Sequence, residues 1–267
     1  MLTAEQREEF DHTGIMRLPG AIAPKETQEM LNLVWDAVEQ RTDVRRDDPR
    51  TWKGQRVMGK QDLPASTTFA QIGSPAICDT LDRLFGRSKW QRPERWASML
   101  VTFPDSAAKW SVPHTTWHLD FPASRDFEGL FAARLFVCLA RLTRGGGGTV
   151  FVAGSHRLVQ KLISDSDADQ IRSAEARKAL IRAHPWVKSL CSPDGKTDRV
   201  GQFMNRSARL TGGVDARVVE MTGEAGDVLL THPLLLHAAA TNCTQSPRIV
   251  LSSTIYRCGV TPSSIYN

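Results

Sequence analysis

The sequence has no long hydrophobic run, no leader in which basic residues precede apolar ones, and no closely spaced cysteines. Its longest apolar runs, such as residues 234–240, are far shorter than the roughly 20 residues that cross a bilayer as a helix. The polar, acidic start does not resemble a secretion signal. Five scattered cysteines form no CxxC pair, which suits reduced thiols better than a disulfide or zinc framework. We therefore expect a cytoplasmic protein without a membrane segment.

A strong excess of one charge is also missing. The formal net charge of +5 is too small to indicate nucleic-acid binding without a dense basic stripe. The nearest candidate is residues 41–60, where arginines and lysines are interrupted by aspartates. A solvated loop is the simplest interpretation. The alternative is a lid that meets an anionic substrate, since clefts lined with one charge attract the opposite one.

The chain, with 267 residues and 41% hydrophobic content, is long enough for one domain with a sizeable core. Residues 1–95 are predicted to be mostly helical, with helices after Thr3, over 23–41 and after Ser74–Pro75. Residues 96–267 contain short strands rich in Val, Leu, Ile and Phe, separated by turn residues, which indicates a jelly-roll core. The strands are expected within 98–103, 130–142, 149–154, 216–221, 227–232 and 249–257.

A polar segment over about 157–216 interrupts the strands, and residues 168–183 within it favour a helix that ends before His184–Pro185. Long connections inside compact domains usually have a function or their own structure. We expect this insertion to cover one mouth of the barrel near the candidate site. The four glycines at 145–148 lack the Lys-Ser/Thr of a phosphate loop, so they are interpreted as a strand connection.

His118 and Asp120 form the most informative pair in the sequence. Side chains alternate along an extended segment, so these two point the same way and can hold one ion. A third ligand from a distant strand would complete the two-histidine, one-carboxylate triad that leaves coordination positions open. His237 lies in such an apolar strand. By contrast, His114 is not expected to be a ligand, and His156 and His232 are expected to be structural.

Arg248 follows His237 across a turn. If the two flanking strands pair as a hairpin, Arg248 stands beside His237 on the neighbouring strand. Its planar guanidinium could then bind the far carboxylate of a diacid whose other end chelates the metal.

The order of HxD, GGTVFVAGSH, GDVLLTHPLLLH and PRIVLSSTIYR, together with the opening LTAEQREEFDHTGIMRLPG, resembles the phytanoyl-CoA dioxygenase family. The insertion matches nothing in that pattern. The resemblance implies a mainly β fold with flanking helices around a double-stranded β-helix. It also implies Fe(II) held by His118, Asp120 and His237, with Arg248 on the C5 carboxylate of 2-oxoglutarate and O2 as the second cosubstrate.

The family often has a hydroxyl residue two positions after the distal histidine, where this chain has Ala239. Thr241 and Thr149 are candidate replacements, and Met99 is a candidate to line the cosubstrate pocket. The candidates for substrate contact are Trp117, Phe121, Arg125 and Arg134. Core packing is the default interpretation of the two aromatic residues, with a wall of the substrate pocket as the alternative, and it is an equally good interpretation of Met99.

The expected function is oxidation, by default hydroxylation, of a small organic metabolite with release of succinate and CO2. The basic balance favours an anionic substrate, but neither the substrate nor the oligomeric state follows from the sequence. Three further functions would use a similar fold or site. A halogenase would need the position of Asp120 vacated for chloride, a zinc hydrolase could use the same three ligands, and a jelly-roll binding protein would have no activity.

Overall fold

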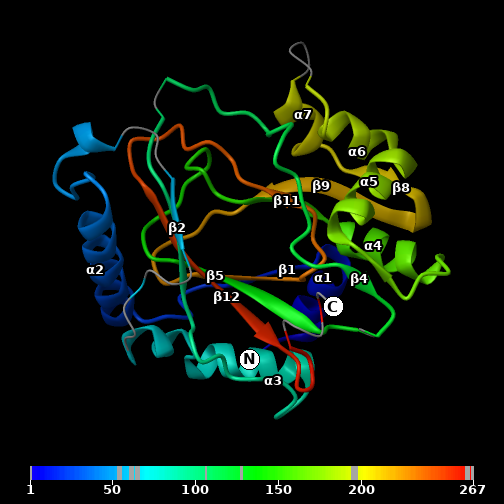
Figure 1. Cartoon of the computed structure of the whole chain (residues 1–267), viewed down its shortest axis with the longest axis horizontal. Helices are drawn as coiled ribbons and strands as arrows, with labels where there is room; N and C mark the ends of the chain where they lie inside the picture. The colour runs from blue at the N-terminus through cyan, green and yellow to red at the C-terminus, as the bar shows by residue number, and fades with distance from the viewer. Residues whose placement is uncertain are drawn as a thin grey trace.

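In the computed structural model, two antiparallel sheets form the centre of the molecule (Figure 1). The structure describes residues 2–52, 56–59, 63, 67–105, 107–126, 129–193, 198–261 and 265. Lys53 and Lys60 of the basic stretch lie outside these residues. The larger sheet has the order β1-β10-β5-β12-β3-β2, and the smaller has the order β11-β6-β9-β8. This is the jelly roll expected from the sequence.

The larger sheet consists of strands from both ends of the chain. Its members in spatial order are β1 (Ile15–Leu18), β10 (Val228–Thr231), β5 (Ala132–Cys138), β12 (Arg248–Tyr256), β3 (Ser98–Thr102) and β2 (Arg56–Gly59). Along β12, Ile249, Leu251 and Ile255 belong to the core beneath the N-terminal helices, whereas Val250 packs between the sheets. Because side chains alternate, Arg248 shares the inner face with Val250.

Helices α1 (Ala4–Thr13), α2 (Pro24–Arg41) and α3 (Pro75–Phe85) confirm the three predicted from the sequence. The capping box at Thr3 and Gln6 forms, and α1 ends at Gly14 with a φ of 74°, a conformation that favours glycine. Buried side chains of α2 and α3 pack in one cluster with the outer face of the larger sheet. The 3-10 helices η1 (Pro49–Thr51) and η2 (Thr67–Ile72) also precede β3.

The smaller sheet contains β11 (His237–Ala238), β6 (Val150–Ala153), β9 (Val214–Glu220) and β8 (Ala208–Leu210), and η3 (Thr211–Gly213) precedes β9. Phe151 on β6 packs between the two sheets together with Val250. The four-glycine segment joins β5 to β6 and opens no helix, as expected. At Gly148 a Cβ would lie 2.1 Å from the Met221 carbonyl oxygen, so only glycine fits there.

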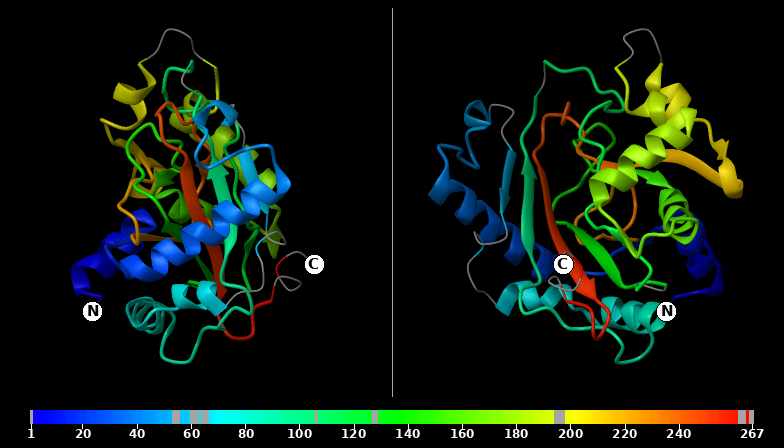
Figure 2. Two further views of the ribbon diagram at one scale, coloured as in Figure 1. Left: turned by 90° about the vertical axis from the view of Figure 1, so that its left-hand side faces the viewer. Right: turned by 45° about the vertical axis from the view of Figure 1, so that its right-hand side comes forward.

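The insertion folds as α4 (Ser155–Ser164), β7 (Gln170–Ile171), α5 (Ser173–Ala183), α6 (Pro185–Leu190) and α7 (Arg199–Phe203). Its helices lie on the opposite side of the molecule from α2 (Figures 1 and 2). Their buried side chains cluster with Val150, Val152 and Val218 on the outer face of the smaller sheet. The insertion helices therefore use their apolar faces to cover this sheet, and their covering of one mouth of the barrel stays a prediction.

None of the helices in the described part of the chain combines the length and apolar character needed to cross a bilayer.

Candidate metal centre

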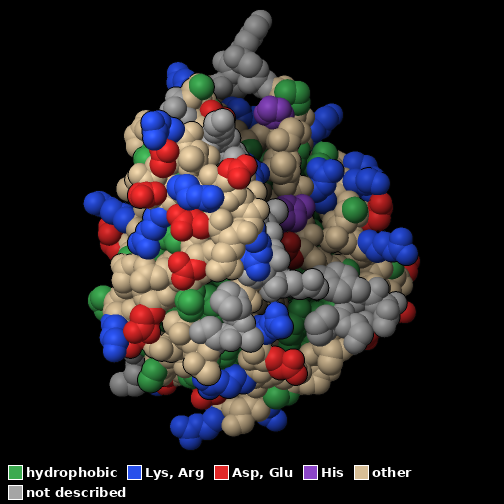
Figure 3. Space-filling view, turned by 60° about the vertical axis from the view of Figure 1, so that its left-hand side comes forward, with side chains coloured by type: hydrophobic (Ala, Val, Ile, Leu, Met, Phe, Trp, Pro, Cys, Tyr) green, Lys and Arg blue, Asp and Glu red, His purple; other side chains and the backbone are tan. Residues whose placement is uncertain are grey.

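His118, Asp120 and His237 form one cluster in which one ligand atom from each residue lies within 4.8 Å of the others. His118 Nε2 is 3.5 Å from Asp120 Oδ1, and His237 Nε2 is 3.6 Å from Asp120 Oδ2. Asp120 precedes the short strand β4 (Ala123–Ser124). The side chain of His118 is 52% exposed and that of His237 only 12%. The cluster is therefore accessible from the His118 side. Figure 3 shows a histidine side chain at the edge of a hollow on one face of the molecule.

Backbone hydrogen bonds hold the two histidines side by side. The N–H of His118 donates to the carbonyl oxygen of His237 at 2.9 Å, and the N–H of His237 donates to that of His118 at 3.0 Å. The ring centroids are 4.2 Å apart. This isolated antiparallel bridge aligns residues that are distant in the sequence without relying on side-chain contacts.

Each imidazole has its Nδ1 next to a backbone carbonyl. His118 Nδ1 lies 2.7 Å from the oxygen of Thr116, and His237 Nδ1 lies 2.9 Å from that of Leu235. A carbonyl accepts only from a protonated nitrogen, so Nδ1 carries a proton and Nε2 is the atom that can bind a metal. On His118 a metal would displace the proton by which Nε2 donates to Asp120. Metal-binding histidines are commonly oriented in this way. Thr116 has a φ of 64°, an uncommon conformation for a non-glycine residue, and it aims its carbonyl at the ring.

Arg134 forms an ion pair with the carboxylate of the cluster, with Nη1 2.9 Å from Asp120 Oδ2. Burial alone would raise the pKa of Asp120, but the His118 hydrogen bond and the positive charge of Arg134 outweigh it and lower that pKa. The hydrogen bond with Asp120 raises the pKa of His118, whereas burial lowers the pKa of His237 to about 4. Asp120 is thus held as a carboxylate and His237 as a neutral imidazole, the forms that bind a metal.

Arg248 is buried between the sheets, and Nη2 donates to Thr149 Oγ1 at 3.0 Å. Its Nε has no hydrogen-bond partner, and no carboxylate pairs with it among the described residues. Burial lowers its pKa to about 10, so the guanidinium is still charged at neutral pH. An uncompensated buried charge is costly, and an anionic ligand would offset that cost.

The route from His237 to Arg248 differs from the predicted hairpin. β11 pairs with β6 in the smaller sheet, whereas β12 pairs with β3 and β5 in the larger one. The turn between them crosses from one sheet to the other, so the hairpin prediction is wrong. Arg248 instead spans the interior to Thr149, which lies two positions along the same face of β6 from Phe151, the partner of His237. Both residues still face one interior.

Two of the proposed cosubstrate contacts do not lie in this interior. Met99 is opposite Leu251 on the helix-covered face of the larger sheet, and it packs in the core there. This placement contradicts its assignment to the cosubstrate pocket. Thr241 is exposed beyond the end of β11. Of the hydroxyl candidates, only Thr149 contacts Arg248.

The substrate candidates separate into two groups. Trp117 and Phe121 alternate with the ligands and are buried in the core under the insertion helices, so core packing, and not a wall of the site, accounts for both. Arg125 is exposed, and its guanidinium donates to the Ser166 carbonyl oxygen of the insertion. Only Arg134 both contacts the cluster and lines a cavity.

Residues 53–55 and 60 of the basic stretch lie outside the described ranges, so the lid stays a prediction. Arg56 of this stretch donates to the carbonyl oxygen of Ala240, three positions after His237, at 3.4 Å. Trp52, in the described part of the basic stretch, packs against Trp35 and Phe103 beside α2.

The insertion supports the cluster from behind. Buried Arg199 donates to the carbonyl oxygens of Val112 and Pro113 at 2.8 and 3.0 Å, and so anchors the segment that leads to His118.

The other histidines are separate from the cluster. His156 and His232 contact each other with ring centroids 4.6 Å apart, and burial lowers the pKa of both. His114 is exposed, and the cluster does not include it.

Two imidazoles that turn Nε2 towards the cluster, together with one carboxylate, fit a divalent metal such as Fe(II), and they leave further coordination positions open. Arg248 independently fits 2-oxoglutarate, the cosubstrate expected with that metal. Its unpaired buried guanidinium suits one end of a dicarboxylate. The residues present therefore fit both iron and 2-oxoglutarate.

The model of the family described as phytanoyl-CoA dioxygenase (PhyH) matches residues 10–250. Among the curated proteins, none matches the chain. Solved structures with the same fold include the epimerase SnoN in complex with Fe3+, alpha ketoglutarate and nogalamycin RO, at 19% identity over 94% of this chain and 82% of that one, with a TM-score of 0.53. The carbocyclase SnoK from nogalamycin biosynthesis is 16% identical over 96% and 84%, with a TM-score of 0.57. HygX from Streptomyces hygroscopicus with nickel and 2-oxoglutarate bound is 16% identical over 98% and 89%, also with a TM-score of 0.57.

Proposed function

The chain belongs to the phytanoyl-CoA dioxygenase family of iron- and 2-oxoglutarate-dependent enzymes, and on this premise we propose that it hydroxylates a small organic metabolite. The observation that carries the proposal is the buried, unpaired Arg248, which faces the same interior as the His–Asp–His cluster. A metal site alone would suit many activities. A metal site together with Arg248, a cation that can bind the second carboxylate of a diacid, suits a 2-oxoglutarate-dependent activity.

In this proposal His118, Asp120 and His237 hold the iron, and Arg248 with Thr149 binds the C5 carboxylate of 2-oxoglutarate. When bound together, iron, 2-oxoglutarate and O2 supply an oxidant that removes hydrogen from a C–H bond. One oxygen atom enters the substrate as hydroxyl and the other enters succinate, while CO2 leaves.

The chain's own residues bind and orient these reactants. Thr116 and Leu235 hold the Nδ1 protons so that Nε2 faces the metal. Arg134 binds Asp120 Oδ2, which restricts rotation of the carboxylate and leaves Oδ1 for the metal. Arg248 fixes the far end of the diacid, which sets how its chelating end approaches the cluster. The buried surroundings of Arg248 exclude water and strengthen this ion pair.

Hydroxylation is the proposed outcome because it needs only hydrogen removal and return of the oxygen. SnoN is named as an epimerase and SnoK as a carbocyclase, so the products must be identified for this chain. The substrate is proposed to be a small molecule rather than a nucleic acid. A cytoplasmic location is part of the proposal, supported by five free thiols.

Anaerobic calorimetry on the Mn(II)-loaded chain tests the two binding roles directly. Pyruvate shares the chelating 2-oxo acid of 2-oxoglutarate but lacks the second carboxylate. The wild type should bind 2-oxoglutarate far more tightly than pyruvate, and Arg248→Met should remove the difference. Equal affinity of the wild type for the two acids would overturn the proposal. Succinate formation with Fe(II) and O2 then tests turnover.

A further inference from the structure

A cavity opens within the larger sheet, beside the C-terminal half of β12. β12 pairs with β5 as far as Tyr256, but with β3 only as far as Ser252. The chain that precedes β3 returns to β12 at Gln91, whose N–H donates to the Tyr256 carbonyl oxygen at 2.8 Å. Between these two points Pro93, which has no N–H, interrupts any ladder. The resulting space is about 650 Å³, a size typical of small-molecule sites.

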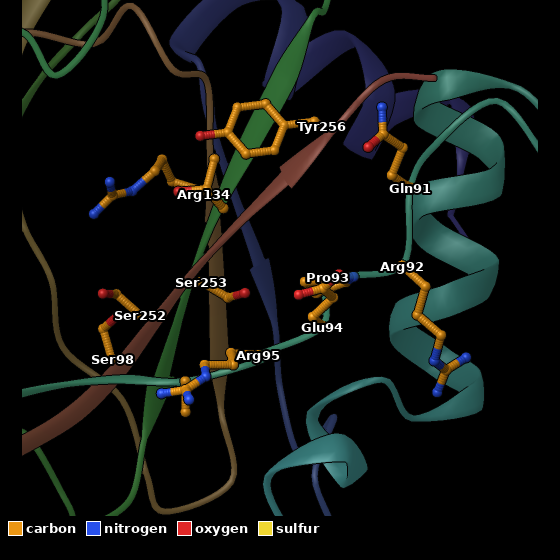
Figure 4. Close-up of a pocket in the computed structure, with 12 residues that line it drawn as sticks. Gln91, Arg92, Pro93, Glu94, Arg95, Ser98, Arg134, Ser252, Ser253 and Tyr256 are labelled. Carbon is orange, nitrogen blue, oxygen red and sulfur yellow. The ribbon is translucent and has the colours of Figure 1, made fainter. Parts of the chain in front are cut away.

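The cavity adjoins the metal cluster through one side chain. Arg134 lines the cavity and also lies 2.9 Å from Asp120. Figure 4 shows Arg134 and Tyr256 pointing to the same side of the sheet as Ser98 and Ser252. This is the inner face of the sheet. Ser252 and Tyr256 lie on the same face of β12 as Arg248, because an even number of positions separates them and side chains alternate along a strand. A molecule in the cavity would therefore contact Arg134, the residue that pairs with the proposed metal ligand Asp120.

Residues with hydroxyl or charged side chains outnumber apolar residues in the described part of the cavity wall, although carbon atoms make up more of its surface. Five residues contribute hydroxyls: Ser98, Ser252, Ser253, Thr254 and Tyr256. The apolar residues of this described wall are only Pro93 and Ala97. An acyl chain would leave the Ser253 hydroxyl, which is buried without a hydrogen-bond partner, still unsatisfied, which is unfavourable. A ligand that itself carries many hydroxyls can pair with the hydroxyls of the wall.

The charge of the wall is positive. Arg95 is exposed at the cavity and forms no ion pair with another residue of the described ranges. Arg134 uses Nη1 for Asp120, which leaves further N–H donors on its guanidinium. Glu94 is the one carboxylate among the described lining residues. Arginines bind carboxylates and phosphates with two parallel hydrogen bonds, so the wall favours an anion over an amine.

From these observations we propose that the cavity is the substrate site and that it takes a hydroxyl-rich organic anion, namely a sugar carboxylate or a sugar phosphate. The acidic group contacts Arg95 and the hydroxyls pair with Ser98, Ser252 and Tyr256. Arg134 then places the sugar ring beside the metal. This inference rests on the proposed oxidation at the His–Asp–His cluster, which it extends to a class of substrate.

Calorimetry on the full chain loaded with Mn(II) and 2-oxoglutarate under anaerobic conditions tests the proposal. The probes are D-glucuronate and D-glucose 6-phosphate, compared with neutral D-glucose, cationic D-glucosamine and octanoate. We expect one or both sugar anions to bind about tenfold more tightly than each of the other three. Whether glucuronate or glucose 6-phosphate binds better identifies carboxylate or phosphate as the acidic group.

Two variants with the same loss of charge make the test specific. Arg95→Gln should weaken binding of the preferred sugar anion about tenfold. Arg87→Gln is the matched control, because Arg87 is exposed and is not among the described residues that line the cavity. Its effect should stay within about twofold, and binding of Mn(II) and 2-oxoglutarate should be unchanged in both variants.

The outcomes separate this inference from the function on which it rests. If Mn(II) and 2-oxoglutarate bind but neither sugar anion does, or octanoate binds as well as they do, the substrate class is overturned and the proposed function stands. Equal losses in Arg87→Gln and Arg95→Gln would also overturn it, since only net charge would then matter. Failure to bind Mn(II) and 2-oxoglutarate at all overturns both.

Discussion

Arg134 Nη1 lies 2.9 Å from Asp120 Oδ2, so a residue of the proposed substrate cavity also holds a proposed metal ligand. The two side chains come from different elements, since Arg134 is on β5 and Asp120 precedes β4. The orientation of the carboxylate therefore depends on the larger sheet as well as on its own segment.

Arg134→Gln should weaken metal binding without preventing it. Partners of metal-binding carboxylates typically contribute about 10- to 100-fold to metal affinity or activity. Competition with a chelator for Co(II) measures this loss. Arg125→Gln is the control, because Arg125 is exposed and donates to the Ser166 carbonyl instead. Unchanged affinity in Arg134→Gln would show that the ion pair has no influence on the site.

His118→Ala, Asp120→Ala and His237→Ala should each abolish Fe(II) binding and turnover while the chain still folds. Each variant removes one of three donors that share the ion. The iron content of the purified protein and its circular dichroism spectrum check the two parts of this prediction. His114→Ala, which alters an exposed histidine outside the cluster, should retain iron. Wild-type turnover in Asp120→Ala would contradict the assignment.

Arg248→Met should make the ligand-free protein more stable and remove its response to 2-oxoglutarate. The variant removes a buried charge that pairs with no carboxylate among the described residues, and even a buried ion pair can be replaced by apolar residues with a gain of roughly 1–4 kcal/mol. Loss of a buried charged pair with the cosubstrate should weaken 2-oxoglutarate binding by about thirtyfold to several thousandfold, from roughly 2–5 kcal/mol. Thermal unfolding with and without 2-oxoglutarate and Mn(II) measures both effects.

Thr149→Val provides a graded comparison for that result. It removes the hydroxyl that accepts from Arg248 but keeps the guanidinium. The expected loss in 2-oxoglutarate affinity is about five- to tenfold, from one hydrogen bond of roughly 1 kcal/mol or slightly more. A loss as large as that in Arg248→Met would mean that Thr149 itself holds the carboxylate.

Glu220→Gln should change how stability depends on pH. Burial raises the pKa of Glu220 from 4.5 to about 7, although Gly145 N–H and Arg144 oppose the shift. The folded chain therefore keeps this proton more tightly than the unfolded one. The stability that the proton contributes is present at about pH 4 and is lost as the pH rises towards 7. Urea unfolding at pH 5 and pH 8 should show the wild type losing more free energy than the variant, by up to about 3 kcal/mol. An equal loss of unfolding free energy in the wild type and in Glu220→Gln would contradict the raised pKa of Glu220.

The alternation of side chains made part of the site predictable from the sequence. His118 and Asp120 share a face of an extended segment, and His237 was recognisable within its apolar strand. The same rule applied to β12 would have placed Ser252, Thr254 and Tyr256 on the face of Arg248, because apolar residues dominate the alternate positions. These cavity residues were missed although their signal was present in the sequence.

Other features depend on packing that a periodic pattern does not contain. The chain crosses between sheets before Arg248, since the turn joins strands with different partners. The apolar stripes of the insertion helices predicted burial but not which surface they would cover. Nothing in the sequence distinguishes Arg199 from the other basic residues. In the structure it is buried, and its N–H groups donate to backbone carbonyl oxygens. Such roles are set by distant segments.

The exchange of backbone hydrogen bonds between His118 and His237 has a consequence for synthesis of the chain. Chains emerge from the ribosome N-terminus first, so His118 and Asp120 are exposed long before their partner strand exists. Until β11 has emerged they can offer a metal only two side chains. The complete site forms only when nearly the whole chain is available to fold. Holding a metal with all three side chains is therefore a property of the finished protein and not of the growing one.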